Sequence, residues 1–206
     1  MDVEGPGSPI RSVRDFAIHI ATVTIGILIA LALEALIGMY RDRTLVVHAE
    51  TDFRTEFSAN RATIVDDLRD SQAVKTELEG LINYGQAEIS GQAAVLPNLQ
   101  TVRKFTHLQA TAWETATATQ ALLHIPFSKA GVLSKTQRAQ QSFNALQDQA
   151  EVQWFELAAY GDPRHIPKSQ LPAALQKVTI AYAYLVSIRD AETRLISSYD
   201  VALRAL

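Results

Sequence analysis

The feature that most constrains this chain is one long apolar segment near its N-terminus. Residues 16–39 read FAIHIATVTIGILIALALEALIGM, and only His19 and Glu34 in this stretch can carry a charge. A helix rises 1.5 Å per residue and the hydrocarbon core of a bilayer is about 30 Å thick, so about 20 apolar residues cross it. A buried helix of a soluble protein seldom exceeds about 14 such residues. We therefore predict a short tail over residues 1–15 and a transmembrane helix over residues 16–39.

A cleaved signal peptide is the alternative interpretation of this segment. Its apolar region would span about 7–15 residues and end at a cleavage site of small residues. Here the apolar run is longer, and Gly38, Met39, Tyr40 and Arg41 follow it, so an uncleaved signal anchor fits better. Tyr40, Arg41 and Arg43 are of the aromatic and cationic types that anchor a helix at the membrane surface. Basic residues are nearly balanced on the two sides, so charge alone leaves the orientation open.

Four residues within the predicted membrane helix follow one another at four-residue steps. Gly26 and Ala30 form a pair of small residues, which Thr22 extends by one turn, and such a strip lets a second helix approach closely. Ionisable residues inside a membrane usually face protein, which favours a partner beside Glu34. The alternative places Glu34 and His19 near the two membrane surfaces. Thr22, Gly26, Ala30 and Glu34 are the candidate partner interface.

The rest of the chain, residues 40–206, is predicted to form a helical bundle domain. Apolar residues recur at three- to four-residue steps over residues 40–84, over residues 126–160 and from residue 169 or 170 to the C-terminus. We expect Gly85 to end the first helix, and helix to resume near Asn98 after a connector. Residues 111–125 extend that helix or form a short one. The predicted fold class is all-α, with one N-terminal transmembrane helix continuing into an antiparallel bundle of long helices.

The polar residues of these helices are expected to face solvent. Residues 136–153 (TQRAQQSFNALQDQAEVQ) keep helical spacing despite their many glutamines, so we interpret them as a solvated helix face. Asp66 and Asp67 are interpreted as an exposed acidic pair. Trp113 and Trp154 lie among apolar neighbours and are expected to anchor the core.

Catalytic and ligand-binding motifs are not evident in the sequence. Without cysteine the chain has no thiolate nucleophile, cysteine-ligated zinc or iron–sulfur cluster, and no nucleotide-binding or hydrolase signature occurs. His48, Asp52 and Glu56 stand four apart, and we interpret them as a solvated face rather than a metal site. The other histidines of the domain, His107 among them, have no carboxylate or second histidine at ligand spacing. We expect no cofactor, no metal and no enzymatic activity, and the net charge of −3 gives no basic surface for nucleic acid.

The N-terminal region resembles a group of uncharacterised bacterial single-pass membrane proteins. Residues 26–31 (GILIAL) match the G-[IV]-L-[IL]-A-L signature of that group, residues 13–16 (VRDF) precede it, and residues 112–114 (AWE) are also similar. Glu34 and Ala35 stand where many members carry an aromatic pair. The resemblance implies a bacterial inner-membrane protein with a cytoplasmic N-terminus and a helical domain in the periplasm. The group has no assigned catalytic residues.

These observations together favour a non-catalytic function. We expect an accessory or scaffold subunit of a larger bacterial membrane complex, with integral membrane subunits and the lipid bilayer as its partners. A homo-oligomer of this chain stays open as an alternative assembly. The alternative function is a helical periplasmic domain that senses a ligand bound between its helices and signals through a partner.

Overall fold

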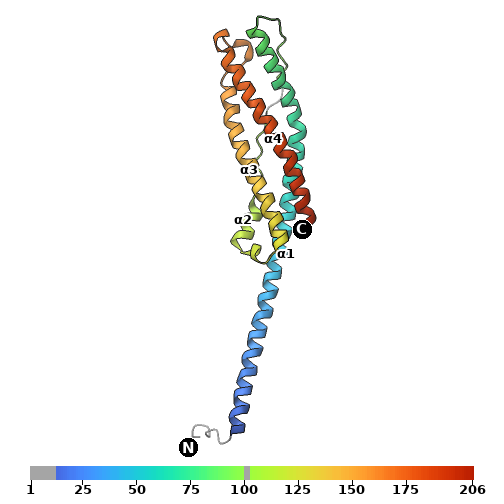
Figure 1. Cartoon of the computed structure of the whole chain (residues 1–206), viewed down its shortest axis with the longest axis vertical. Coiled ribbons are helices and arrows are strands. Elements are labelled where there is room, and N and C mark those ends of the chain that lie inside the picture. The colour runs from blue at the N-terminus through green and yellow to red at the C-terminus, as the bar shows by residue number, and fades with distance from the viewer. Residues whose placement is uncertain (1–12, 100–102) are drawn as a thin grey trace, which may run out of the picture. The chain divides into compact units, whose positions relative to one another are not determined.

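The computed structural model describes residues 13–99 and 103–206 and is all-α, as predicted. Within these residues it contains no strand. The four helices are α1 (Val13–Ile89), α2 (Thr111–Ala118), α3 (Phe127–Ala158) and α4 (Leu171–Ala205), and the three short 3₁₀ turns are η1 (Ala121–Leu123), η2 (Pro163–His165) and η3 (Lys168–Gln170) (Figure 1). The chain divides into two compact units between Val47 and His48.

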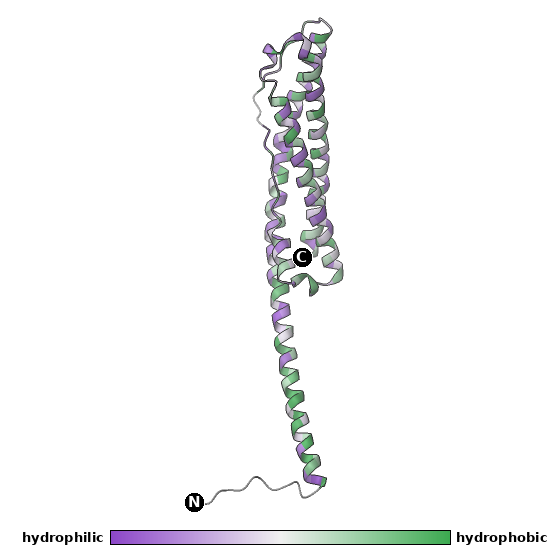
Figure 2. Ribbon diagram, turned by 90° about the vertical axis from the view of Figure 1, so that its left-hand side faces the viewer, coloured by the Kyte–Doolittle hydropathy of each residue, from purple (hydrophilic) through white to green (hydrophobic). Residues whose placement is uncertain are grey.

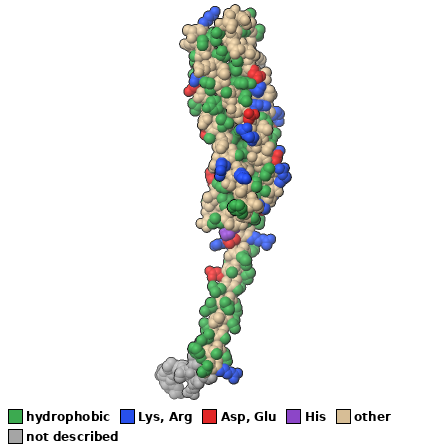
Figure 3. All heavy atoms as spheres, in the orientation of Figure 1, with side chains coloured by type: hydrophobic (Ala, Val, Ile, Leu, Met, Phe, Trp, Pro, Cys, Tyr) green, Lys and Arg blue, Asp and Glu red, His purple; other side chains and the backbone are tan. Residues whose placement is uncertain are grey.

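The first unit contains the apolar beginning of α1, whose side chains are exposed on every face. The residues from Val13 to Ile37 are all exposed, and hydrophobic side chains crowd this part of the helix (Figures 2 and 3). Two helical stretches in the described chain are long and apolar enough to cross a membrane, Val13–Ile89 and Lys168–Ala205. The most apolar window of the first is 0% buried, whereas that of the second is 33% buried because it belongs to the helical core.

The second unit is a bundle of three long helices, formed by α1 from His48 onward together with α3 and α4. Polar contacts establish their directions. Arg61 Nε lies 2.7 Å from Asp200 Oδ1, and the Tyr182 hydroxyl donates to Glu79 Oε1 at 2.8 Å, so α1 and α4 run antiparallel. Glu50 and Asn60 of α1 contact Lys129 and Gln140 of α3 in that order, so α1 and α3 run in the same direction. Figure 1 shows α3 and α4 side by side.

The core of the bundle follows the apolar periodicity in the sequence. Most residues predicted for the inner faces are buried, and the largest fully buried apolar side chains are Phe53, Phe57, Ile64, Leu133, Leu185, Ile188, Leu195 and Tyr199. The apolar spacing over residues 126–160 also predicts that Phe127 lies on the inner face, and this prediction was wrong, because its side chain is 94% exposed. Phe127 is the first residue of α3, directly after Pro126 at the N-cap, and precedes the turns that contact the other helices.

Gly85, near the end of α1, has a different role from the one expected. The prediction that Gly85 ends the helix was wrong, since α1 continues to Ile89 and Gly91 follows with a φ of +70°. Gly85 is buried against α4 instead. A Cβ at this position would lie 3.2 Å from Leu175 Cδ1, tighter than ordinary contact. The missing side chain therefore lets α1 and α4 approach each other closely.

The connector between α1 and α2 is extended rather than helical. Helix was predicted from Asn98 onward, but residues 98–99 and 103–110 are not helical; residues 100–102 of that prediction lie outside the described chain. The connector runs back along α1, with Pro97 beside Gly80, Arg103 beside Asp67 and Gln109 beside Asn60. Helix resumes only at α2, which confirms a separate short helix within residues 111–125.

Candidate functional site

The predicted partner interface lies on the exposed, apolar part of α1. Thr22, Gly26, Ala30 and Glu34 are all exposed. The Thr22 hydroxyl donates to the Ile18 carbonyl oxygen at 2.9 Å, one turn earlier, so it is satisfied within the helix. A Cβ built on Gly26 meets nothing within 4 Å. The strip is thus open for a second helix along its whole length.

The predicted surface anchors follow the same apolar stretch. Tyr40 is 77% exposed, and Arg41 and Arg43 are exposed beside it. Arg41 Nε lies 3.8 Å from Asp42 Oδ1, an exposed ion pair of little energetic weight. The aromatic ring and the guanidinium groups are therefore available to interfacial partners.

A polar layer crosses the bundle, and we call the buried side chains of Asn60, Gln140 and Tyr199, together with the backbone of exposed Gln109, the amide layer. The Tyr199 hydroxyl donates to Gln140 Oε1 at 2.6 Å, and Gln140 Nε2 donates to the Gln109 carbonyl oxygen at 2.6 Å. Asn60 Nδ2 donates to the same carbonyl oxygen at 2.8 Å and to Gln140 Oε1 at 3.2 Å. These side chains supply the hydrogen bonds that an extended segment would otherwise find in a sheet.

The amide layer contradicts the prediction that the glutamine-rich stretch is a solvated face. Gln137, Gln140 and Gln147 are each at most 2% exposed. Asn144 of the same helix exchanges two hydrogen bonds of 3.0 Å with the backbone of Leu108. Helix α3 therefore turns a partly polar face inward, because the connector that lies against it has backbone groups that need partners.

A second polar level lies two helical turns away, and we call Asp67, Arg103, Gln147 and Glu192 the acidic layer. Seven-residue steps from the amide layer bring Asp67, Gln147 and Glu192 to one level, because α4 runs against the direction of α1 and α3. Arg103, whose side chain is 2% exposed, places Nη1 3.3 Å from Asp67 Oδ1. The prediction that Asp67 is a solvated partner of Asp66 was therefore wrong.

Glu192 is the most unusual group of the acidic layer. It is fully buried, and neither carboxylate oxygen has a hydrogen-bond partner within the described part of the chain. Burial, followed by the neighbouring Asp67 carboxylate, raises the pKa of Glu192 to about 8, although the Arg103 and Arg189 guanidinium groups oppose the shift. Glu192 is consequently a neutral acid within the bundle core at pH 7.

Glu56 caps the short helix α2 from a distance. Its Oε2 accepts a hydrogen bond from the Ala112 backbone N–H at 2.9 Å, at a helix start where Ala110 offers no side-chain cap. Burial raises the pKa of Glu56. The interpretation of His48, Asp52 and Glu56 as one solvated face was thus wrong for Glu56. No group of three metal-ligating side chains is close enough to hold an ion among the residues described.

The remaining predicted features lie on or near the surface of the bundle. His107 does have a carboxylate neighbour, because its Nε2 lies 2.7 Å from Asp148 Oδ1, which corrects the expectation from sequence spacing. Trp113 packs edge-on against Phe53 at 6.3 Å between ring centres, and Trp154 packs against Phe105 at 6.2 Å. Both tryptophans are half-buried anchors.

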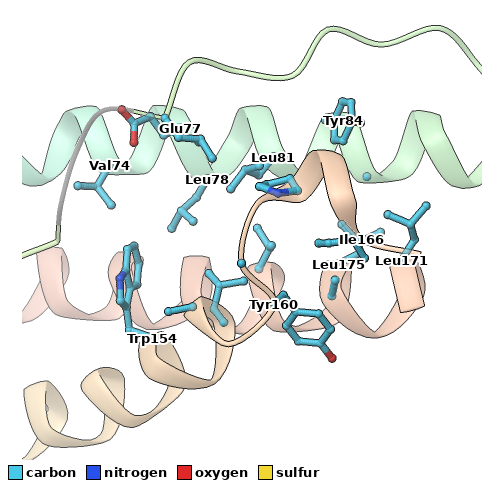
Figure 4. Close-up of a pocket in the computed structure, with 18 residues that line it drawn as sticks. Val74, Glu77, Leu78, Leu81, Tyr84, Trp154, Tyr160, Ile166, Leu171 and Leu175 are labelled. Carbon is cyan, nitrogen blue, oxygen red and sulfur yellow. The ribbon is translucent and has the colours of Figure 1, made fainter. Parts of the chain in front are cut away.

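An apolar pocket of about 200 Å³ lies where α1 and α3 end and α4 begins (Figure 4). Its helical walls include Val74, Leu78 and Leu81 of α1, Trp154 and Leu157 of α3, and Leu171, Leu175 and Val178 of α4. Figure 4 shows the Trp154 ring pointing into the pocket, whereas the Tyr160 hydroxyl and the Glu77 carboxylate point away. The pocket can therefore hold an apolar group but offers little to orient a polar one.

A more open hollow of about 730 Å³ adjoins the pocket. The two share Leu99, Gly161 and Pro163, and the hollow also has polar residues on its wall, Asp162 and Arg164 among them. Arg164 Nε donates to both carboxylate oxygens of Asp162 at 3.0 Å, and these bonds lower the pKa of Asp162 to about 2. The apolar pocket thus adjoins a more open hollow whose wall combines apolar residues with the polar side chains of Asn98, Asp162 and Arg164.

No protein-family model, no curated protein and no solved structure matches this chain.

Proposed function

We propose that this protein is a bacterial inner-membrane protein, anchored by residues 16–39, whose helical bundle serves as a non-catalytic accessory or scaffold subunit of a larger membrane complex. The observation that carries the proposal is the apolar first part of α1, in which every residue from Val13 to Ile37 is exposed. Such a surface is unfavourable in water, and it is long enough to cross a bilayer. The bundle itself has a core of packed apolar side chains crossed by buried polar residues.

The partner interface proposed for this helix is the strip of Thr22, Gly26, Ala30 and Glu34. Between membrane helices, close packing and hydrogen bonds drive association, and small residues allow both. Substitution of Gly26 by Leu is expected to separate the chain from its partner subunits. Gly38 provides the matched control, since a Cβ at either glycine meets nothing within 4 Å.

The experiment is extraction in a mild detergent at native expression level, followed by size analysis and mass spectrometry of the chains that co-migrate. We expect the wild-type chain and Gly38→Leu in one large complex with other integral membrane subunits in fixed ratio, and Gly26→Leu outside it. A wild-type chain that migrates alone would contradict the subunit proposal. A homodimer would instead support a self-associating scaffold.

Orientation is tested by labelling of single cysteines, because the natural chain contains none. We propose a cytoplasmic N-terminus and a periplasmic bundle. A membrane-impermeant maleimide should label Ser58→Cys, an exposed position of the bundle, in spheroplasts or intact cells with a permeable outer membrane. Val13→Cys should be labelled only after the inner membrane is opened. The reverse pattern would place the bundle in the cytoplasm.

A second candidate function is ligand sensing, and the apolar pocket between α1, α3 and α4 is the observation that favours it. A sensor of this kind would transmit binding through a partner helix in the membrane. Under this candidate, ligand addition changes the recovery of the complex described above, whereas a purely structural subunit gives the same recovery with and without ligand.

A further inference from the structure

We propose that the apolar pocket binds the aliphatic chain of a single-chain amphiphile, with its polar head group in the adjoining hollow. The proposal deepens the ligand-sensing candidate and rests on it for its biological meaning. The binding itself is independent of any partner subunit. It can therefore be tested whether or not the chain belongs to a complex.

The lining of the pocket selects against a wholly polar ligand. Side chains such as Leu78, Leu157 and Val178 form the walls, and the Trp154 ring points into the pocket. A polar or charged group inside would give up its hydrogen bonds to water without replacement. An apolar cavity of about 150 Å³ accepts a molecule the size of benzene, so about 200 Å³ has room for a short length of aliphatic chain.

The space exists because small residues stand where larger ones would fill it. Gly85, Ala158, Gly161 and Ala174 all line the pocket. Gly85 lets Leu175 approach α1, and Gly161 adopts a φ of +67° that turns the chain away after α3. The ends of the three helices therefore surround the apolar pocket instead of packing fully against one another. A larger side chain at Ala174 would occupy the apolar pocket.

The adjoining hollow determines which apolar ligand fits. It shares Leu99, Gly161 and Pro163 with the pocket, so the two spaces are contiguous. Asp162 and Arg164 line the hollow as a closed ion pair, and backbone and side-chain polar groups there are open to water. A ligand with an apolar end and a polar end matches an apolar pocket beside a hollow that contains polar side chains, whereas a pure hydrocarbon would leave those side chains without a ligand partner.

Ligand binding can be followed by the fluorescence of the two tryptophans. Trp154 lines the pocket, whereas Trp113 packs on Phe53. Phe53 and Val74 are 21 residues apart on one helix, or about 30 Å, so the reporters are well separated. The full chain is placed in phospholipid nanodiscs as Trp113→Phe, which reports Trp154, and as Trp154→Phe, which reports Trp113. The probe is 8-bromooctanol, with 8-bromooctanoate as the charged-head comparison.

We expect saturable quenching of Trp154, displaced by unlabelled octanol, with quenching of Trp113 at least fivefold weaker. Ala174→Leu should abolish the saturable quenching, and Ala158→Leu, at an exposed position on the pocket wall, should weaken it. The matched control Ala173→Leu is exposed and outside the pocket, so it should bind like the parent.

Equal or non-saturable quenching of both tryptophans would mean partition from the bilayer and would overturn the proposal. So would saturable quenching that Ala174→Leu and Ala158→Leu leave unchanged. If only the alcohol quenches, the head group is uncharged; if the carboxylate also quenches, the hollow accepts an anion beside Arg164. Recovery of the membrane complex is measured separately, so failure of binding leaves the subunit proposal standing, and the reverse also holds.

Discussion

Glu192 makes the stability of the bundle depend on pH in a direction that can be calculated. Its pKa rises from 4.5 to about 8 on folding because it is buried and lies beside Asp67. The folded state therefore binds more protons than the unfolded state between these values, and stability falls as the pH rises through this range. At 1.36 kcal/mol per pKa unit, the loss between pH 4.5 and pH 7 is about 3 kcal/mol.

Glu192→Gln removes this ionisation and keeps the shape of the side chain. The amide does not titrate, so the variant keeps a neutral side chain at every pH of the assay. We expect the variant to be more stable than wild type by about 3 kcal/mol at pH 7, or roughly 6–12 °C in Tm for a bundle of this size. At pH 4.5 the two should be almost equal. Asp190→Asn, at an exposed position of the same helix, should leave the slope against pH unchanged.

The assay is thermal unfolding of the purified full chain in detergent, followed by circular dichroism between pH 4.5 and pH 8. Ion-paired carboxyls add little to the change in stability over this pH range, because the pKa values of Glu79, Asp162 and Asp200 are lowered by their partners. The stability that they contribute is lost as the pH falls through their ordinary pKa values of 4.5 for Glu79 and 3.8 for the two aspartates, at and below the acid end of this range. A flat wild-type profile, or a Glu192→Gln variant that is less stable than wild type at pH 8, would refute the reasoning.

Three further substitutions test other parts of the bundle. Gln140→Leu should lower the free energy of unfolding by about 2–3 kcal/mol, since it strands buried polar partners, whereas exposed Gln141→Leu should change it by less than about 0.5 kcal/mol; equal effects in chemical denaturation would contradict the amide layer. Glu56→Ala should speed amide exchange at the start of α2 by about fivefold because a cap worth about 1 kcal/mol is lost; unchanged exchange would show that the cap is unimportant. Gly80→Ala places a Cβ 2.9 Å from the connector proline and should lower Tm, whereas Gly131→Ala meets nothing within 4 Å and should raise it; the opposite order would contradict the packing of the connector.

The long helices were predictable because apolar spacing and packing agree in them. Phe53, Phe57 and Ile64 follow three- to four-residue steps or their multiples, and all three are buried. The error at Gly85 has a simple cause, since glycine is used at helix ends and also where two helices approach closely. Only the position of Leu175 on another helix distinguishes the two uses.

The extended connector was not predictable from local pattern. Phe105 and Leu108 stand three apart, which is typical of a helix, but the hydrogen bonds of this segment come from side chains more than 30 residues away in sequence. The buried glutamines had one usable signal. Leu133, Gln140 and Gln147 are seven residues apart, so the two glutamines continue the heptad of a buried leucine. Because glutamine is polar, these residues were predicted to face solvent. The residues that pack against them lie elsewhere in the sequence, so the local pattern did not reveal their burial.

The apolar pocket could not be predicted from the sequence either. It forms where the ends of three helices meet, and the small size of Gly85 and Ala174 leaves it empty of side chains. Small residues at helix ends occur for many reasons, and no linear spacing marks a cavity. The exposed strip of Thr22, Gly26 and Ala30, by contrast, was named from spacing alone, and its partner remains a prediction.

The most direct test of the central claim is alkaline carbonate extraction of cell membranes combined with the intact mass of the chain. We predict a full-length wild-type chain that stays in the membrane pellet. Leu28→Lys with Ile29→Lys should move it to the soluble fraction, because each lysine at mid-membrane costs about 3 kcal/mol. The control pair Leu123→Lys and Phe127→Lys, at exposed apolar positions of the bundle, should stay in the pellet. A soluble wild-type chain, or one that has lost its apolar N-terminal segment, would contradict the account.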